Sequence, residues 1–290
     1  MKLQLLSDLH LERDPDFRPT PAPDADALVL AGDIGSYQRG SRLKDDTFGL
    51  AAFSPHRSTC PWKTVLYVPG NHEYDDLDFD ETHARLQDVC ERLGIVLLER
   101  STVTLDGVRF IGTTLWTDFD ALALGTRPVS SHPTADSPLT IRLRQREKAF
   151  RAANYYLSKN STLRRGAPML AQDIREFGLE CQQWLRAALA EAHDGPTVVV
   201  THFAPSLRSH DPRFGVTPGT AGFCNALDDL FPAARLWVHG HLHCRNDYFV
   251  AGDVDGHPFR CRVVANPLGY REKGEQQEFQ PALVLEVPPA

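Results

Sequence analysis

The chain has 290 residues, a length that fits one large domain or two small ones. Its composition, 42% hydrophobic and 24% charged, is that of an ordinary globular protein that folds without help from disulfides. A formal net charge of −7 disfavours non-specific binding of nucleic acid, and no apolar run approaches the length of a membrane span.

Short apolar runs that end in small or polar residues predict buried strands along the chain. They span Leu3–Leu6, Ala27–Ala31, Val65–Val68, Thr197–Thr201 and Arg235–His239. Apolar residues at helical spacing between Leu170 and Ala192 predict a helix before the fourth of these strands. The alternation of strands and helices is typical of an α/β fold.

Two further segments predict antiparallel hairpins, so a mixed sheet is expected rather than a purely parallel one. One hairpin spans Val103–Ile111 and the other Asp247–Val264, each with an Asp-Gly turn. A stretch rich in Pro, Ser, Thr and Ala, followed by a basic stretch, predicts an insertion at about residues 118–169. Because no repeat or linker is evident, we expect a single domain over residues 1–290.

The cysteines and the N-terminus indicate the cellular compartment in which the protein is expected. The cysteines form no closely spaced pair of the zinc-ribbon or redox type, which fits a reducing environment. The first apolar run is too short for the core of a signal peptide. We therefore expect a cytoplasmic protein whose six cysteines are reduced: Cys60, Cys90, Cys181, Cys224, Cys244 and Cys261.

Side chains that can bind metal ions follow all five predicted strands. Because residues just past the carboxyl ends of neighbouring strands converge in an open α/β sheet, donors far apart in sequence can meet in one crevice. Gly32, Gly70 and Gly240 permit tight turns beside these donors. In chain order the donors are Asp8, His10, Asp33, Asn71, His202, His241 and His243.

The chemistry of this donor set indicates a pair of divalent ions. Carboxylate, imidazole and amide donors without a thiolate suit Mn, Fe, Zn or Ni. A carboxylate such as Asp33 can bridge two ions, and two adjacent ions stabilise both the attacking and the leaving oxygen of a phosphoryl displacement.

The ordered series Asp-x-His, Gly-Asp, Gly-Asn-His-Glu, His and Gly-His-x-His, from Asp8 to His243, resembles the calcineurin-like metallophosphoesterase family. The resemblance implies an α/β fold, an αββα sandwich of two mixed β-sheets flanked by helices. It implies one ion on Asp8, His10, Asp33 and His243, and a second on Asp33, Asn71, His202 and His241. It also makes His72 a catalytic histidine that contacts the phosphate together with Asn71 and helps to protonate the leaving oxygen. A hydroxide held between the ions would be the nucleophile.

The sequence departs from two branches of that family. Ile34-Gly35-Ser36 follows Asp33, without the further Asp and Arg of the protein Ser/Thr phosphatases, which argues against a phosphoprotein substrate. Tyr37 lies four residues after Asp33, whereas purple acid phosphatases place a tyrosine ligand three residues after it. We therefore assign no metal to Tyr37.

Single motifs have ordinary structural explanations, since Asp8 fits a helix cap and His202 a strand end. Strand alternation points His239 away from the crevice if Val238 faces the core, so a structural role is expected. Glu73 fits either a carboxylate that orients a ligand or a solvent-exposed one. The remaining histidines lack a motif and are expected at the surface: His56, His83, His132, His193, His210 and His257.

Residues 139–165 carry eight basic residues against one acid, Glu147. Their arginines could grip an anionic substrate as a lid over the crevice, because guanidinium groups match phosphate oxygens. A solvated helix face and a subunit contact are the alternatives.

The sequence thus predicts a hydrolase that cleaves a phosphomonoester or phosphodiester of a small metabolite or nucleotide, with two divalent metal ions as cofactors. No membrane or nucleic-acid partner is expected. One alternative is a non-catalytic metal-binding scaffold of the same fold, which the complete ligand set argues against. Another is a DNA nuclease of the family, which the acidic balance disfavours.

Overall fold

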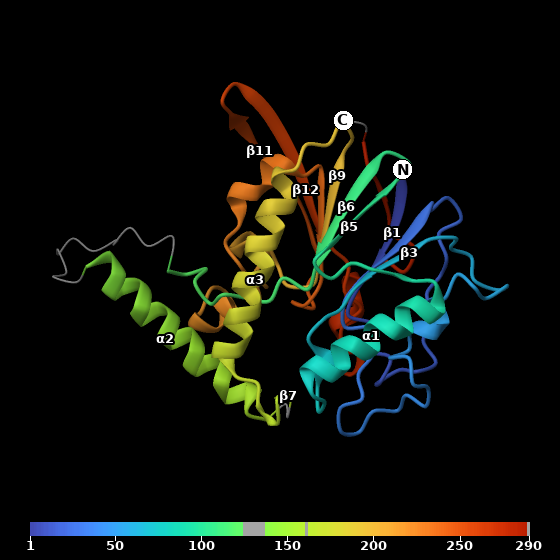
Figure 1. Ribbon diagram of the computed structural model, residues 1–290, viewed down its shortest axis with the longest axis horizontal. Helices are drawn as coiled ribbons and strands as arrows, with labels where there is room; N and C mark the ends of the chain where they lie inside the picture. The colour runs from blue at the N-terminus through green and yellow to red at the C-terminus, as the bar shows by residue number, and fades with distance from the viewer. Residues whose placement is uncertain (124–136, 160–161, 289–290) are drawn as a thin grey trace.

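The computed structural model describes residues 1–123, 137–159 and 162–288, and contains two large β-sheets with helices on their outer sides (Figure 1). Four strands of the first sheet are parallel to one another, and the C-terminal strand β13 is antiparallel to β1. In spatial order this sheet contains β13 (Val284–Glu286), β1 (Lys2–Leu6), β2 (Ala27–Ala31), β3 (Val65–Val68) and β4 (Val96–Leu97).

The second sheet is also mixed. Its four central strands are parallel, and each edge strand belongs to an antiparallel hairpin. In spatial order it contains β11 (Asn246–Val254), β12 (His257–Ala265), β10 (Leu236–His239), β9 (Thr197–Thr201), β6 (Val108–Thr113) and β5 (Ser101–Leu105). A small separate hairpin is formed by β7 (Leu163–Arg164) and β8 (Ala167–Pro168).

Within the described ranges, three α-helices lie outside the sheets: α1 (Phe79–Leu93), α2 (Pro138–Leu157) and α3 (Ala171–Ala190). Local signals account for the ends of α1, since the Asp78 side chain accepts from two backbone N–H groups and Gly94 ends the helix with φ of 70°. Short 3₁₀ helices occupy η1 (Leu50–Phe53), η2 (His72–Tyr74), η3 (Leu207–Ser209), η4 (Pro218–Gly222), η5 (Asp228–Ala233), η6 (Arg271–Lys273) and η7 (Glu275–Glu278).

The central strands bury both of their faces. One buried cluster joins alternate residues of the two sheets, among them Leu5, Val29, Val200 and Val238, so the sheets pack against each other. The intervening residues, such as Trp237, belong to the cluster beneath the helices. Burial on both faces explains why the strands are continuous apolar runs. The predicted α/β fold with two mixed sheets flanked by helices is confirmed.

The predicted elements are found close to their expected positions. The five predicted strands are β1, β2, β3, β9 and β10, the predicted helix is α3, and both hairpins are present. The six cysteines are free, as expected. Among the described residues, no helix combines the length and apolarity that crossing a membrane requires.

Candidate metal centre

The first sheet contributes four of the predicted donors from the loops that leave its parallel strands. Asp8 and His10 follow β1, Asp33 follows β2, and Asn71 follows β3. Backbone hydrogen bonds join the first two loops, since the N–H of Asp8 donates to the Gly32 carbonyl. These loops therefore leave the sheet side by side and turn their polar side chains the same way.

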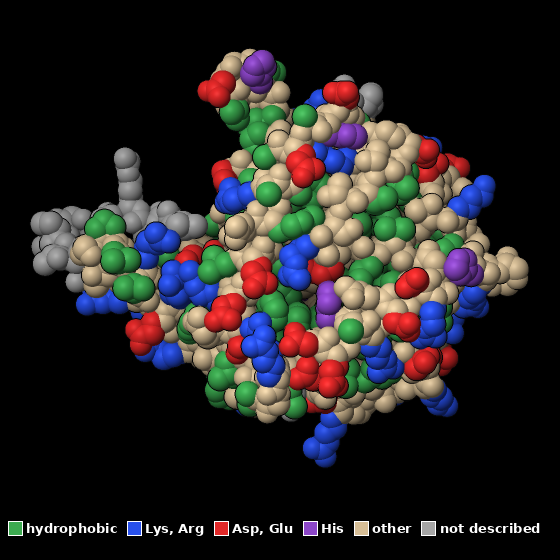
Figure 2. All heavy atoms as spheres, in the orientation of Figure 1, with side chains coloured by type: hydrophobic (Ala, Val, Ile, Leu, Met, Phe, Trp, Pro, Cys, Tyr) green, Lys and Arg blue, Asp and Glu red, His purple; other side chains and the backbone are tan. Residues whose placement is uncertain are grey.

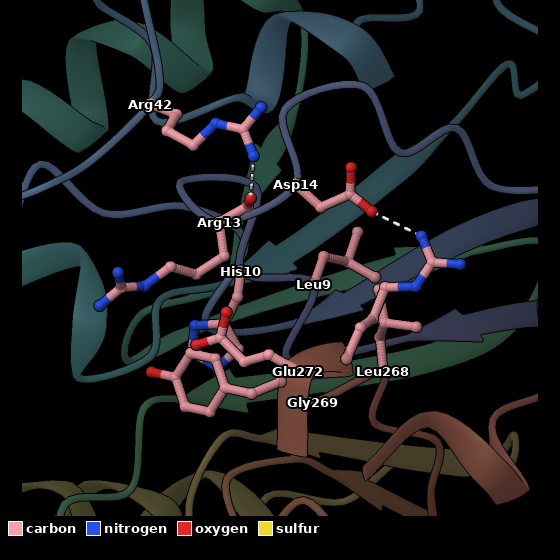
Figure 3. Close-up of a pocket in the computed structure, with 10 residues that line it drawn as sticks. Leu9, His10, Arg13, Asp14, Arg42, Leu268, Gly269 and Glu272 are labelled. Carbon is pink, nitrogen blue, oxygen red and sulfur yellow. Dashed lines mark hydrogen bonds and ion pairs between the residues drawn. The ribbon is translucent and has the colours of Figure 1, made fainter. Parts of the chain in front are cut away.

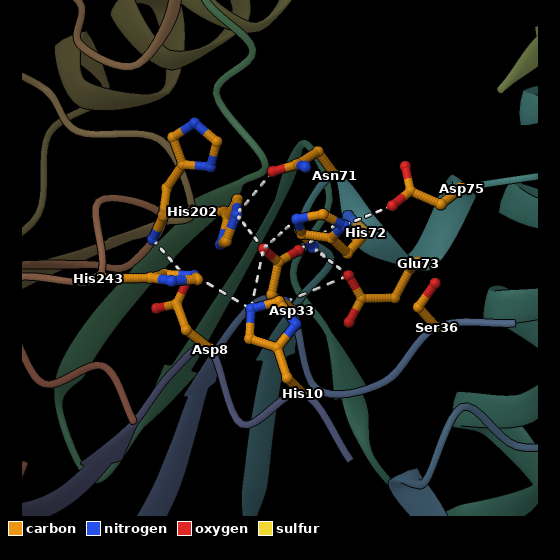
Figure 4. A network of polar contacts seen from close by, with 12 residues as sticks. Asp8, His10, Asp33, Ser36, Asn71, His72, Glu73, Asp75, His202 and His243 are labelled. Atoms are coloured by element: carbon orange, nitrogen blue, oxygen red, sulfur yellow. Dashed lines mark hydrogen bonds and ion pairs between the residues drawn. The ribbon is translucent and has the colours of Figure 1, made fainter. Parts of the chain in front are cut away.

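The second sheet contributes the other three donors from the loops after β9 and β10. His202 follows β9, and His241 and His243 follow β10. The backbone N–H of His241 donates to Asp8 Oδ1 at 2.8 Å, which joins the two sheets across the crevice. Figure 4 shows the side chains of both sheets directed toward one centre.

The structure brings all seven predicted donors together. Donor atoms of Asp8, His10, Asp33 and His243 lie within 4.8 Å of one another, as do those of Asp33, His202 and His241. Asn71 Oδ1 lies 3.2 Å from His202 Nε2, so the amide belongs with the second group. Asp33 belongs to both groups, which is the arrangement expected of a bridging carboxylate.

The backbone at this site is held in an uncommon conformation. A positive φ outside glycine costs about 1–3 kcal/mol and persists where the surrounding structure imposes it, often at functional sites. Five of the seven donors have positive φ: Asp8 (52°), His10 (47°), Asp33 (54°), His241 (74°) and His243 (47°).

Two of the neighbouring glycines are required for close approach, in addition to their expected place in turns beside the donors. Neither Gly70 nor Gly240 has a positive φ. A Cβ atom at Gly70 would lie 2.1 Å from Asp33 Oδ1, and one at Gly240 would lie 2.6 Å from Asp8 Oδ2. Any side chain at either position would therefore displace a carboxylate of the centre.

Unsatisfied buried atoms show that the donor set fits metal ions. Asp8 Oδ2, Asp33 Oδ2 and His241 Nε2 are buried without a hydrogen-bond partner. His202 Nε2 lies 3.3 Å from Asp33 Oδ2, although this oxygen accepts no hydrogen bond of acceptable geometry. Buried polar atoms are normally paired, because leaving one unpaired costs about 1–3 kcal/mol. Their clustering within both donor groups is the pattern that cations would satisfy.

The electrostatics of the centre depend on its two aspartates. Burial by itself would raise the pKa of Asp33, but the charges of His202 and His72 hold it well below its usual value. Burial lowers the pKa of His202, but Asp33 more than offsets this and raises it to about 9. The buried negative charge is thus strong enough to hold a cationic imidazole beside it.

The match to known families agrees with this geometry. The family model for calcineurin-like phosphoesterases matches residues 1–245, which include every donor of the centre. The chain belongs to the calcineurin-like phosphoesterase family. It is also similar to the uncharacterized protein L509 of Acanthamoeba polyphaga mimivirus, at 24% identity over 98% of this chain and 96% of that protein. Family membership makes a phosphoesterase hydrolase with divalent metals the general expectation for such a centre.

Two of the donor histidines each contact a carboxylate through Nδ1, and the sequence did not identify these carboxylates. Glu12 Oε1 lies 3.0 Å from His10 Nδ1, and Glu275 Oε2 lies 2.7 Å from His243 Nδ1. Such carboxylates orient a metal-binding imidazole and raise its basicity. Glu12 could have been suspected from its position two residues after His10, whereas no local signal marks Glu275.

The sequence leaves two roles open for Glu73, a carboxylate that orients a ligand and a solvent-exposed one. The structure shows a buried carboxylate. It accepts hydrogen bonds from the backbone N–H groups of Asp33 (3.2 Å), Ile34 (2.7 Å) and Gly70 (2.8 Å). Burial, followed by the charge of Asp33, raises the pKa of Glu73 to about 7. Glu73 therefore holds together the loops that present Asp33 and Asn71.

His72 lies beside the centre at the start of η2, with a side chain 21% exposed. Its backbone N–H donates to Asp33 Oδ1 at 2.8 Å, and its Nε2 lies 4.0 Å from Asp33 Oδ2. The other ring nitrogen, Nδ1, forms a short hydrogen bond with Asp75. Burial lowers the pKa of His72, but Asp75 and Asp33 outweigh it and raise the pKa to about 10. The ring is therefore protonated and directed at the crevice.

Histidines without a motif lie outside the donor groups. His239 is buried between Ser209 (3.0 Å) and the Gly240 carbonyl (3.0 Å), on the face of β10 opposite Val238, as alternation predicts. His56 and His257 are exposed, whereas His83, His193 and His210 are only half-buried. His132 lies outside the described residues.

Of the three alternatives for the basic stretch, the position of α2 argues against a lid over the crevice. Figure 1 shows α2 on the far side of α3 from the two sheets, and Figure 2 shows Lys and Arg side chains gathered over it. Arg146 donates to both oxygens of Asp120 at 2.7 Å, and Arg151 donates to Glu147 at 2.8 Å. These arginines hold the insertion together, because their carboxylate partners lie within or beside it.

Proposed function

We propose that this protein hydrolyses phosphomonoesters or phosphodiesters of small metabolites or nucleotides, using two divalent ions bound at the carboxyl ends of the two sheets. The observation that carries the proposal is the set of buried, unpaired donor atoms on Asp8, Asp33 and His241, with His72 Nε2 lying 4.0 Å from Asp33 Oδ2.

One ion would be held by Asp8, His10, Asp33 and His243, and the other by Asp33, Asn71, His202 and His241. The grouping of the carboxylates and imidazoles supports this division. When bound, the ions polarise the phosphoryl group and lower the pKa of water, which provides a nucleophile near neutral pH. The oxygen and nitrogen donor atoms suit Mn, Fe, Zn or Ni.

The chain's own contribution to the chemistry centres on His72. Its protonated Nε2 faces the crevice and can donate a proton or a hydrogen bond to the oxygen that leaves phosphorus. Asp75 accepts from Nδ1, which fixes the ring orientation and stabilises the imidazolium. Asp75 is thus a positioning residue and belongs to neither donor group.

A direct test combines metal counting with turnover. We expect purified protein to hydrolyse p-nitrophenyl phosphate or bis-p-nitrophenyl phosphate with Mn²⁺, to lose the activity with a chelator, and to regain it when metal is restored. Folded, metal-loaded protein that cleaves neither ester with Mn²⁺, Fe²⁺, Zn²⁺ or Ni²⁺ would instead support a non-catalytic scaffold.

A further inference from the structure

A pocket of about 260 Å³ lies beside the proposed metal centre (Figure 3). It is formed by the loops after β1 and β12 together with Arg42 from the loop after β2, and His10 belongs both to its wall and to the donor group. The pocket is slightly smaller than most sites for drug-sized ligands, so it suits one small chemical group. A substrate whose phosphoryl group binds at the centre can place a second group here.

The charges in this pocket are unevenly paired. Arg271 is paired with Asp14 at 2.6 Å, on one side of the pocket. Arg42 donates only to the backbone carbonyl of Arg13, at 2.9 Å, and Arg13 has no side-chain partner among the described residues. Two guanidinium groups without a carboxylate partner thus line one small pocket, although the chain as a whole carries a charge of −7.

Tyr270 forms the wall between the pocket and the metal centre. Its ring stacks on His10 with centroids 4.2 Å apart, and Lys273 Nζ lies 4.2 Å from the ring centre. An aromatic group of a ligand would compete with both for the ring, so the pocket is poorly suited to stack a base. The pocket is lined by three guanidinium groups against the two carboxylates of Asp14 and Glu272. Because guanidinium groups match phosphate oxygens, its remaining chemistry favours an anion.

We infer that Arg13 and Arg42 bind a second phosphate group of the substrate, which makes the preferred substrate a small bisphosphorylated compound. This inference rests on the proposed function, since the first phosphate is taken to lie at the metal centre. Arg13 and Arg42 then determine specificity and take no part in the chemical step. Lys273 and the Tyr270 ring keep the wall in place beside the second phosphate.

Binding of non-hydrolysable analogues separates this inference from catalysis. Alkane diphosphonates, from ethane to pentane, are compared by calorimetry with the matching alkyl monophosphonates on metal-loaded protein. We expect at least one diphosphonate to bind about tenfold tighter than its monophosphonate, the ratio that one charge-assisted contact provides. In the double variant Arg13→Ala/Arg42→Ala that ratio should fall below about twofold.

Arg18→Ala is the matched control, because Arg18 is also exposed and donates only to the carbonyls of Pro15 and Phe17. The diphosphonate preference should survive in this variant. Equal affinity of diphosphonates and monophosphonates in the unmodified protein, or a preference that persists without Arg13 and Arg42, would overturn the inference. A preference that depends on both arginines in a protein that cleaves no phosphoester would contradict the proposed function alone.

Discussion

Two aspartates of similar burial serve the molecule in opposite ways. Asp33, at the strand ends, keeps an oxygen without a hydrogen-bond partner among three nearby histidines. Asp120, in the insertion, accepts two hydrogen bonds from Arg146 and lies 3.0 Å from Arg175. Both carboxylates are at most 4% exposed. Burial alone therefore does not identify a metal ligand, whereas an unpaired buried oxygen within the donor groups does.

The difference has a physical origin. A buried charge costs several kcal/mol unless it is paired, so a structural carboxylate such as Asp120 collects guanidinium partners. A metal ligand must leave a lone pair for the ion, and the fold tolerates the resulting cost when metal is absent. The positive φ of Asp33 adds to that cost, whereas Asp120 has no such conformation. Four variants test this contrast.

Asp33→Asn should have the largest effect, because it changes the carboxylate shared by both donor groups. We expect both ions to be lost or weakened together and kcat/KM to fall by about a thousandfold, which corresponds to about 4 kcal/mol of metal-ion catalysis. Elemental analysis counts the metals, and thermal unfolding of the metal-free variant checks the fold. Retention of two tightly bound ions would show that Asp33 is not the bridge.

His72→Asn should lower kcat by about a hundredfold, the low end of the loss expected when a general acid is removed. The metal content should stay at the unmodified level, since His72 belongs to neither donor group. His83→Asn is the control, because His83 is a half-buried histidine bonded to Tyr74 away from the centre. Loss of metal in parallel with activity would make His72 a ligand instead.

Asp120→Ala should destabilise the fold and spare the centre. Removing the carboxylate leaves Arg146 and Arg175 without their shared partner, which lowers the free energy of unfolding by about 3 kcal/mol. Chemical denaturation measures the loss, with Asp229→Ala in the exposed Arg186 pair as a control that costs at most about 1 kcal/mol. A drop in metal content in Asp120→Ala would remove the distinction between the two aspartates.

Glu275→Gln should have the smallest effect of the four, because it removes no metal ligand and changes only the group that contacts His243 and the Tyr270 N–H. Metal affinity should weaken by about tenfold, the low end for the loss of a carboxylate behind a ligand. The control Glu278→Gln changes an exposed residue of the same 3₁₀ helix. Identical metal affinity in both variants would mean that the Glu275 carboxylate does not tune the centre.

The sequence predicted those elements that a clear local pattern marks, and missed those without one. The strands β2, β3 and β9 were placed residue by residue, because continuous apolar runs are characteristic of strands buried on both faces. The helix α1 was not assigned, since its apolar residues are widely spaced between charged ones. The edge strand β13 was also missed, because three residues carry too little pattern and its pairing with β1 joins the two ends of the chain.

Sequence by itself determined which donors this protein carries and in which order they follow its strands. Residue type and local spacing are written in the chain, and the carboxyl ends of neighbouring strands must converge. The tertiary structure alone decided that Glu275 lies behind His243, that Glu73 is buried, and that the arginines of α2 are engaged by carboxylates such as Asp120. Those outcomes depend on distances between residues remote in sequence, which packing sets and no local pattern records.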